Sequence, residues 1–141
     1  MRIGDLAKAT GVDIETIRYY KKVGLLPEPG REANGYRTYR QEHLEQLAFI
    51  RHCRALDMSL ESIRRLLDFV AHPEAECGDI NQLIDAQLAR VRARLNSLRA
   101  LESQLAALRA QCGETHSVRE CGILHELVAA AHGEPRVCHS R

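Results

Sequence analysis

Three of the five cysteines flank one long stretch without proline or glycine, residues 81–112. Cys77 precedes this stretch, Cys112 ends it, and Cys121 follows nine residues later. Three thiolates around a divalent ion leave a net charge of about −1, and soft sulfur ligands favour thiophilic ions over magnesium or calcium. Cadmium, lead, mercury and zinc all suit such a ligand set. The spacing is not that of a standard zinc finger, so buried or incidental thiols are the alternative.

Other cysteines and histidines offer further ligands. His116 lies between Cys112 and Cys121, where it can bind the same ion, bind a second ion, or simply face solvent. Cys138 and His139 near the end of the chain can bind metal adventitiously or stay free. Cys53 stands at an apolar position of a predicted helix, which favours a place in the core.

Basic and aromatic residues near the N-terminus suggest contacts with DNA. Residues 1–54 hold ten Lys and Arg against seven Asp and Glu, whereas the rest of the chain holds ten against twelve. One predicted helix carries hydrogen-bond donors on its outer surface: Thr16, Arg18, Tyr19, Lys21 and Lys22. A following segment adds three arginines and two tyrosines: Arg31, Tyr36, Arg37, Tyr39 and Arg40. An ordinary solvated surface is the alternative.

Glycines and capping residues predict the elements that hold these side chains. Helices are expected over residues 3–10 and 14–23, with Gly11 and Gly24 ending them and Asp13 capping the second. Such a pair is a helix-turn-helix, whose second helix can enter the major groove. Asn34-Gly35 beside alternating residues predicts a hairpin with a two-residue turn, which would form a wing.

Two more helices complete a small head. We predict a third helix over residues 41–56 and a fourth that Ser59 caps and that continues to about Val70. The predicted domains are a winged helix-turn-helix head at 1–72, a hinge at 73–80, a dimerisation helix at 81–112, a loop with a short helix at 113–132, and a flexible tail at 133–141.

The long helix carries an apolar stripe that its own chain is too small to cover. The stripe consists of residues spaced by three and four: Leu88, Val91, Leu95, Leu98, Leu101, Leu105 and Leu108. About 30 residues make a rod of about 45 Å, so a second copy is the natural cover, in a short antiparallel or irregular coiled coil. Antiparallel rods would bring Cys77 of one subunit beside the Cys112–Cys121 loop of the other. A lone helix packed on its own domain is the alternative.

Composition limits the class of protein. With 45% hydrophobic but only 4% aromatic residues, 141 residues favour a mainly α fold with one domain and an extension. There is no apolar run long enough for a membrane span and no signal-peptide pattern, so we expect a cytoplasmic protein without membrane association. Cysteines in that reducing compartment favour metal binding or burial over disulfides. No catalytic motif is visible, and an enzyme is not expected.

Four linked motifs resemble the MerR family of transcription regulators. They are Arg2-Ile3-Gly4-Asp5-Leu6-Ala7, Glu15-Thr16-Ile17-Arg18-Tyr19-Tyr20, Gly24-Leu25-Leu26-Pro27 and Tyr36-Arg37-Thr38-Tyr39. The resemblance implies a homodimer with winged helix-turn-helix heads and an antiparallel coiled coil. It also implies binding to double-stranded promoter DNA between elements that are too far apart for RNA polymerase. The inducer-bound dimer then realigns these elements by distorting the DNA.

The resemblance also implies individual site residues. Family DNA contacts fall on Thr16, Arg18, Tyr19, Tyr36, Arg37, Tyr39 and Arg54. Cys77, Cys112 and Cys121 match the three ligands of the branch that senses divalent ions, whereas the copper-sensing branch lacks the first. Residues 51–58 and Cys77-Gly78 are similar to the cadmium- and lead-responsive subgroup. His116 falls where zinc sensors place a histidine, but their extra cysteine is replaced by Gln111.

The expected function is therefore metal-induced activation of transcription, with cadmium or lead as inducer and zinc or mercury as alternatives. A thiol-rich metal-buffering or metal-delivery protein is a second hypothesis. A regulator of the same fold that answers an organic cation is the third, although the chain lacks a larger C-terminal binding domain.

Overall fold

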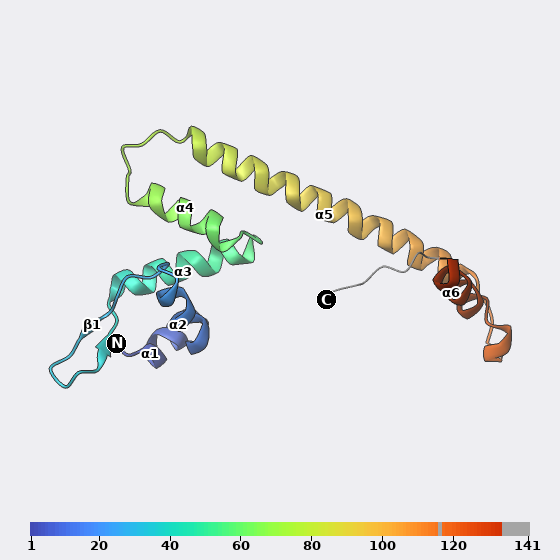
Figure 1. Ribbon diagram of the computed structural model, residues 1–141, viewed down its shortest axis with the longest axis horizontal. Coiled ribbons are helices and arrows are strands. Elements are labelled where there is room, and N and C mark those ends of the chain that lie inside the picture. The colour runs from blue at the N-terminus through green and yellow to red at the C-terminus, as the bar shows by residue number, and fades with distance from the viewer. Residues whose placement is uncertain (116, 134–141) are drawn as a thin grey trace. The chain divides into compact units, whose positions relative to one another are not determined.

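The computed structural model describes residues 1–115 and 117–133, and the chain is mainly helical (Figure 1). The elements follow in the order α1 (Ile3–Thr10), α2 (Ile14–Lys22), β1 (Gly30–Arg31), β2 (Arg37–Thr38), α3 (Gln41–Ala55), α4 (Leu60–Val70), α5 (Gly78–Ala110), the short 3-10 helix η1 (Val118–Glu120) and α6 (Gly122–Gly133). Residues 1–87 form one compact unit, which we call the head, and the residues from Leu88 onward form another. The predicted mainly α fold with a winged head and a long helix is confirmed.

The helix-turn-helix has the predicted boundaries to within one residue. Gly11 ends α1 at a φ of 74°, a left-handed conformation that suits glycine, and its N–H donates to the Ala7 carbonyl at 2.8 Å. Asp13 caps α2 by accepting a hydrogen bond from the Thr16 N–H at 2.8 Å. The α2 helix ends at Lys22, and Gly24 beyond it has a φ of 80°.

The wing is a hairpin, but its turn differs from the predicted two-residue turn. β1 and β2 are antiparallel, with Gly30 opposite Thr38 and Arg31 opposite Arg37. The Glu32 N–H donates to the Tyr36 carbonyl at 2.7 Å, so three residues, 33–35, form the connection. Gly35 has a φ of 86°, whereas Asn34 keeps a negative φ. A turn followed by one left-handed glycine satisfies the hairpin without a second left-handed residue.

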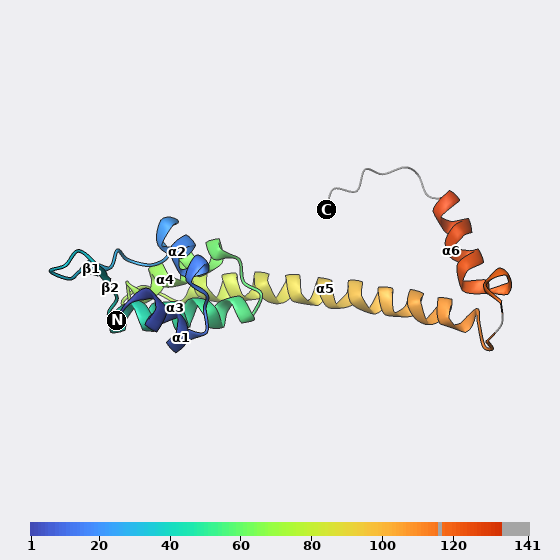
Figure 2. The ribbon, with the colours of Figure 1, turned by 90° about the horizontal axis from the view of Figure 1, so that it is seen from below.

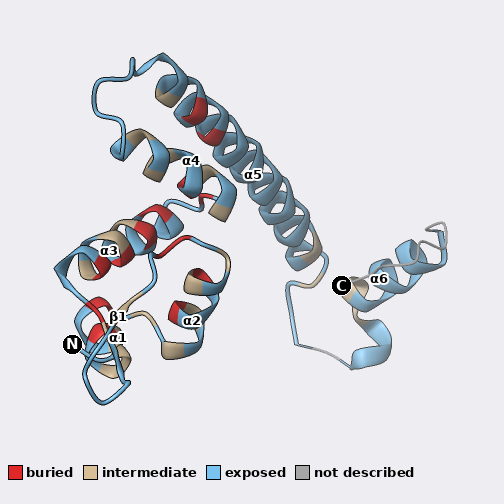
Figure 3. Cartoon of the chain, turned by 60° about the vertical axis from the view of Figure 1, so that its left-hand side comes forward, coloured by how far each residue is buried: buried red, intermediate tan, exposed pale blue. Residues whose placement is uncertain are grey.

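The core of the head lies where α1, α2, α3 and α4 meet, and Figure 3 shows its buried residues in red. Its most deeply buried apolar side chains are Leu6, Ile17, Leu25, Leu47, Ile50 and Ile63. Ser59 caps α4 as predicted, accepting a hydrogen bond from the Ser62 N–H at 3.1 Å. These helices hold α2 and the wing in fixed positions within the head.

The head extends beyond the predicted boundary at residue 72. The α5 helix begins at Gly78, inside the predicted hinge 73–80, and its first turns contribute the buried side chains Leu83 and Gln87. Residues four apart lie on the same face of a helix, so one face of this part of α5 packs against the head. Figure 3 shows these buried positions near the start of α5.

The long helix is continuous from Gly78 to Ala110 (Figure 2), starting three residues earlier and ending two residues earlier than predicted. Its apolar stripe is exposed within the chain: Ile84, Leu88, Val91, Leu95, Leu98, Leu101 and Leu105 are 42–64% exposed. Exposed apolar side chains on α6 are Leu124, Leu127 and Val128. Among the described residues, no helix is both long and apolar enough to cross a membrane.

Candidate DNA-binding surface and thiol site

The outer face of α2 presents the predicted donors. Arg18 and Tyr19 are exposed, and Thr16 is half-buried. Arg18 Nη1 lies 2.7 Å from the Glu15 carboxylate in a solvent-exposed pair. Such pairs are worth at most about 1 kcal/mol, so this contact can give way to a phosphate or base. At the start of the helix, hydrogen bonds from the Thr16 backbone N–H and side chain lower the pKa of Asp13, and its cap is therefore ionised at neutral pH.

A hollow of about 360 Å³ joins the recognition helix α2 to the wing. Its lining residues are Arg2, Ile3, Arg18, Arg31, Gly35, Tyr36, Arg37 and Tyr39. Four guanidinium groups on one concave surface suit the phosphate backbone, because arginine can donate two parallel hydrogen bonds to phosphate oxygens. The structure thus brings the predicted Arg18, Tyr36 and Arg37 together on one surface.

Arg2 belongs to this surface although the residue-by-residue prediction of DNA contacts omitted it. Its guanidinium lies 4.1 Å from the centre of the Tyr36 ring and 3.8 Å from the Glu32 carboxylate. Stacking on an aromatic ring fixes the orientation of an arginine while leaving its N–H groups free to bind other groups. The sequence feature that could have pointed to Arg2 as a DNA contact is its place at the start of the first family motif.

Tyr39 differs from its expected place on the surface. Its side chain is only 2% exposed and meets the His43 ring edge-on, with the ring centres 5.2 Å apart. Burial raises the pKa of the Tyr39 hydroxyl, although Arg37 and Arg18 act in the opposite direction. Tyr39 therefore lies at the base of the wing hollow, and its contact with DNA stays a prediction. Because Tyr39 lies between Arg37 and Arg40 in the sequence, sequence reasoning places it on the surface with them.

His43 fixes the junction between the wing and α3. The side chain is 1% exposed, and its Nδ1 accepts a hydrogen bond from the Arg40 N–H at 3.0 Å. Its Nε2 lies 3.2 Å from the Pro27 carbonyl, which can only accept, so Nε2 is the donor in this hydrogen bond. Both ring nitrogens thus have partners, and they join the segments on either side of the wing, at Pro27 and Arg40, to α3.

Arg54 lies in the last turn of α3 and does not line the wing hollow. Its side chain is exposed, and its Nη1 donates to the Met58 carbonyl at 2.6 Å. It thus lies beside the turn that joins α3 to α4. Contact between Arg54 and DNA stays a prediction.

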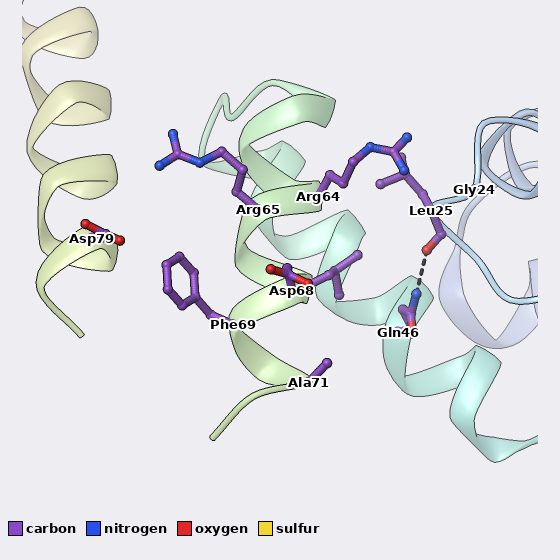
Figure 4. Close-up of a pocket in the computed structure, with 10 residues that line it drawn as sticks. Gly24, Leu25, Gln46, Arg64, Arg65, Asp68, Phe69, Ala71 and Asp79 are labelled. Atoms are coloured by element: carbon purple, nitrogen blue, oxygen red, sulfur yellow. Dashed lines mark hydrogen bonds between the residues drawn. The ribbon is translucent and has the colours of Figure 1, made fainter. Parts of the chain in front are cut away.

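A second hollow in the head, about 670 Å³, shows how the end of α2 is anchored (Figure 4). Gln46 of α3 donates to the Leu25 carbonyl, and Arg64 of α4 donates to the Val23 carbonyl, each at 2.5 Å. None of the residues predicted to bind DNA or metal lines this hollow. These two hydrogen bonds hold the segment that follows α2 against α3 and α4.

The thiols of the C-terminal loop share one hollow. Cys112 and Cys121 are both half-buried, and both line a space of about 350 Å³ together with residues 113–115 and the start of α6. The Cys112 thiol donates to the Glu114 carbonyl at 3.2 Å, and Arg109 donates to the Cys112 carbonyl. The Cys121 carbonyl accepts the first hydrogen bond of α6, from the His125 N–H. The structure thus brings two of the three predicted thiol ligands to one place.

Cys77 belongs to the head rather than to this loop. It is exposed, its carbonyl accepts the Asn81 N–H at 3.1 Å at the start of α5, and it lines an apolar hollow with Phe49 and Phe69. Within the described part of one chain, no group of three or more His, Cys, Asp or Glu side chains is placed to hold a metal ion. His116, Cys138 and His139 lie outside the described residues. Cys53 is buried, as expected, and burial raises the pKa of its thiol.

A winged helix-turn-helix with a cationic face, followed by a long helix, defines a DNA-binding regulator. Residues 1–70 match the MerR HTH family regulatory proteins, and residues 44–108 match the family described as MerR, DNA binding. The chain is 40% identical over 139 residues to the HTH-type transcriptional regulator ZntR of Escherichia coli (strain K12), covering 97% of this chain and 99% of the relative. The protein belongs to the MerR family of transcription regulators.

Solved structures agree with this assignment. The transcription regulator PbrR691 from Ralstonia metallidurans CH34, in complex with lead(II), is 49% identical with a TM-score of 0.77, over 90% of this chain and 98% of that chain. MerR from Bacillus megaterium MB1, in complex with mercury(II), is 34% identical with a TM-score of 0.69, over 91% and 99%. The resemblance stated from the sequence is confirmed, and so is the expectation of a regulator rather than an enzyme.

Proposed function

We propose that the protein binds promoter DNA as a homodimer and activates transcription by distorting that DNA when a thiophilic divalent metal binds. RNA polymerase then uses the realigned promoter elements. The observation that carries the proposal is the shared hollow of Cys112 and Cys121, because two thiols that face one space can be completed by a third sulfur. The cationic surface of α2 and the wing supplies the DNA-binding half.

The exposed stripe of α5 supports the homodimer. Apolar side chains repeat along this face from Ile84 to Leu105, and a second copy of the same helix would remove them from water. Cys77 precedes the 33-residue helix α5, whereas Cys112 and Cys121 follow it. In an antiparallel pair, Cys77 of one subunit would join Cys112 and Cys121 of the other.

Cadmium or lead is the proposed inducer, and zinc or mercury the alternative. PbrR691 is crystallised with lead(II), and MerR of Bacillus megaterium with mercury(II), so relatives with these folds hold large thiophilic ions. Three sulfur ligands suit such ions. His116 is proposed as a further ligand, to the same ion or to a second one.

The proposal is tested by adding cadmium, lead, mercury and zinc separately to the reduced protein in competition with a chelator. Thiolate-to-metal absorption bands report binding. Wild type and Cys138→Ser should show saturable bands, whereas Cys112→Ser should lose at least about tenfold in affinity, because one of three sulfur ligands is gone. Equal binding by Cys112→Ser would place the metal elsewhere and reject the thiol site.

Footprinting separates the regulator from a metal-buffering or metal-delivery protein. The regulator protects a palindromic promoter sequence with and without metal, and only the metal-bound form activates transcription from it. Cys112→Ser should keep the footprint and lose the activation. A protein that binds metal but protects no promoter sequence would be the buffering or delivery protein.

A further inference from the structure

Gln87 is a buried polar residue of α5 that holds the turn between α3 and α4. Its side chain is 6% exposed, and its amide Nε2 donates to two backbone carbonyls, those of Leu56 and Asp57, each at 3.0 Å. An amide nitrogen has two hydrogens, so each carbonyl receives one. These carbonyls lie in the segment that follows the end of α3 at Ala55.

The turn that Gln87 holds is tightly specified. Asp57 has a φ of 64°, the one left-handed residue other than glycine in the described chain. The Met58 N–H reaches back to the Cys53 carbonyl at 3.2 Å, and the Met58 carbonyl accepts from Arg54 Nη1. The predicted DNA contact Arg54, the left-handed residue and the Gln87 amide therefore meet in one short segment, residues 54–59, which we call the α3–α4 turn.

We propose that Gln87 is a positioning residue that couples α5 to the α3–α4 turn, so that a displacement of α5 reaches Arg54 and changes the DNA-bound state. The inference rests on the proposed function, because α5 also leads to the metal-binding loop. Leu83, one helical turn earlier, is an apolar side chain that is 5% exposed, and apolar burial specifies direction poorly because it is non-directional. Two hydrogen bonds to adjacent carbonyls specify both distance and orientation.

Substitution by methionine isolates the hydrogen bonds. Gln87→Met keeps the length and most of the volume of the side chain but removes both donors, which leaves two carbonyls without this partner. Gln82→Met is the matched control, since Gln82 is exposed on the same helix. Gln87→Glu is a second variant, in which a carboxylate faces the two carbonyls and should act at least as strongly as methionine.

Hydrogen exchange on the metal-free protein gives the first readout, independent of any inducer. Amides of residues 56–59 should exchange about tenfold faster in Gln87→Met than in wild type, and Gln82→Met should match wild type. Unchanged exchange in both Gln87 variants would overturn the proposal, because the turn would then not depend on this side chain.

Metal-dependent transcription gives the second readout. In Gln87→Met, metal affinity should stay within about twofold of wild type, while the ratio of metal-induced to metal-free transcription should fall by about fivefold or more. A merely structural role would lower operator affinity equally with and without metal and leave this ratio intact, which would also overturn the coupling.

The two proposals fail in different ways. If wild type itself shows no metal-induced transcription, the proposed function fails, whatever the exchange data show. If wild type responds and Gln87→Met responds equally, only the coupling role of Gln87 fails. If Gln87→Met does not fold, Gln87→Asn keeps one amide donor group with a shorter reach, and the same ratio should fall by a smaller factor than in a donor-free variant.

Discussion

Arginines on the wing hollow are held by contacts that they can exchange for DNA. Arg2 stacks on Tyr36, Arg18 pairs with Glu15, and Arg31 donates to the Gly35 carbonyl at 3.2 Å, all at exposed positions. Each contact orients a guanidinium without burying it. A surface of this kind is ready to bind phosphate with little loss of side-chain freedom.

Replacing one of these arginines should weaken DNA binding in a way that salt reports. We expect Arg18→Ala to raise the operator Kd by about 10- to 100-fold, the usual effect of losing one well-placed arginine. If Arg18 contacts phosphate, the dependence of log Kd on log salt concentration should fall by about one unit. Fluorescence anisotropy at several salt concentrations measures both.

Lys8→Ala is the control, because Lys8 is an exposed cation on α1 outside the wing hollow. An operator Kd for Arg18→Ala that equals that of Lys8→Ala would remove Arg18 from the interface. Arg2→Ala, tested in parallel, asks whether the residue that only the structure brought to this surface also contributes.

At the scale of residues, the sequence predicts the chemical character of a side chain better than it predicts how far that side chain is exposed. Arg18 and Arg37 are predicted DNA contacts because their donors suit DNA, and the structure brings both to the wing hollow. Tyr39 was expected on the surface, yet it is buried against His43, since an aromatic ring can serve the core with a polar group at its edge. Gln87 gave no signal, because a polar residue beside an apolar stripe normally faces water.

At the scale of elements, the N-terminus of the recognition helix predicts a response to acid. Hydrogen bonds from Thr16 lower the pKa of Asp13 below 3.8, so the charged cap stabilises the folded state above that value. This stabilisation is lost as the pH falls below 3.8 and through the folded-state pKa. Asp13→Asn keeps a capping oxygen without the titration, so wild type should lose stability relative to this variant only below about pH 4.

Urea unfolding at about pH 7 and about pH 3 measures this difference. Asp85→Asn serves as the control, since Asp85 lies within α5 rather than at a helix N-terminus. The difference in the free energy of unfolding between wild type and each variant is compared at the two pH values. If acidification changes this difference equally for Asp13→Asn and for Asp85→Asn, the Asp13 cap is excluded as the source of the acid response.

Most element boundaries were predictable because the chain marks them locally. Gly11, Asp13, Gly24 and Ser59 act within one turn of a helix, and each has the expected role. The wing turn was less predictable, since Asn-Gly suits more than one connection and cross-strand pairing of Glu32 with Tyr36 decides between them. The start of α5 depended on packing against the head, which no local signal reports.

At the scale of the whole molecule, the proposed thiol site, formed between two subunits, predicts complementation between defective subunits. We propose mixing a Cys77→Ser chain with a Cys112→Ser chain and purifying the mixed dimer by two different tags. One site then has Cys77 from one subunit and the intact loop of the other. The second site has serine in place of both Cys77 and Cys112. The mixed dimer should bind about half as much metal as wild type, with wild-type affinity.

Dimers of either variant alone provide the control, and both should bind poorly. A mixed dimer that also binds poorly would mean that each site draws all its thiols from one chain. Metal per dimer is measured after removing free ions with a chelator. The sequence predicts all three thiols as ligands, and the structure brings Cys112 and Cys121 to one hollow. The contribution of Cys77 from a second subunit stays a prediction, because a single chain contains no partner helix.

The uninterrupted interior of α5 has a consequence for how such regulators diversify. After Gly78 the helix contains neither glycine nor proline through Ala110, so it offers no point at which bending would absorb a movement. The two loop thiols and the cationic surface lie in separate segments of the chain, within residues 112–121 and within residues 2–39. Under the proposed function, substitutions in residues 111–121 are expected to change the ion preference without changing the promoter sequence that the head binds, so the two specificities can change independently.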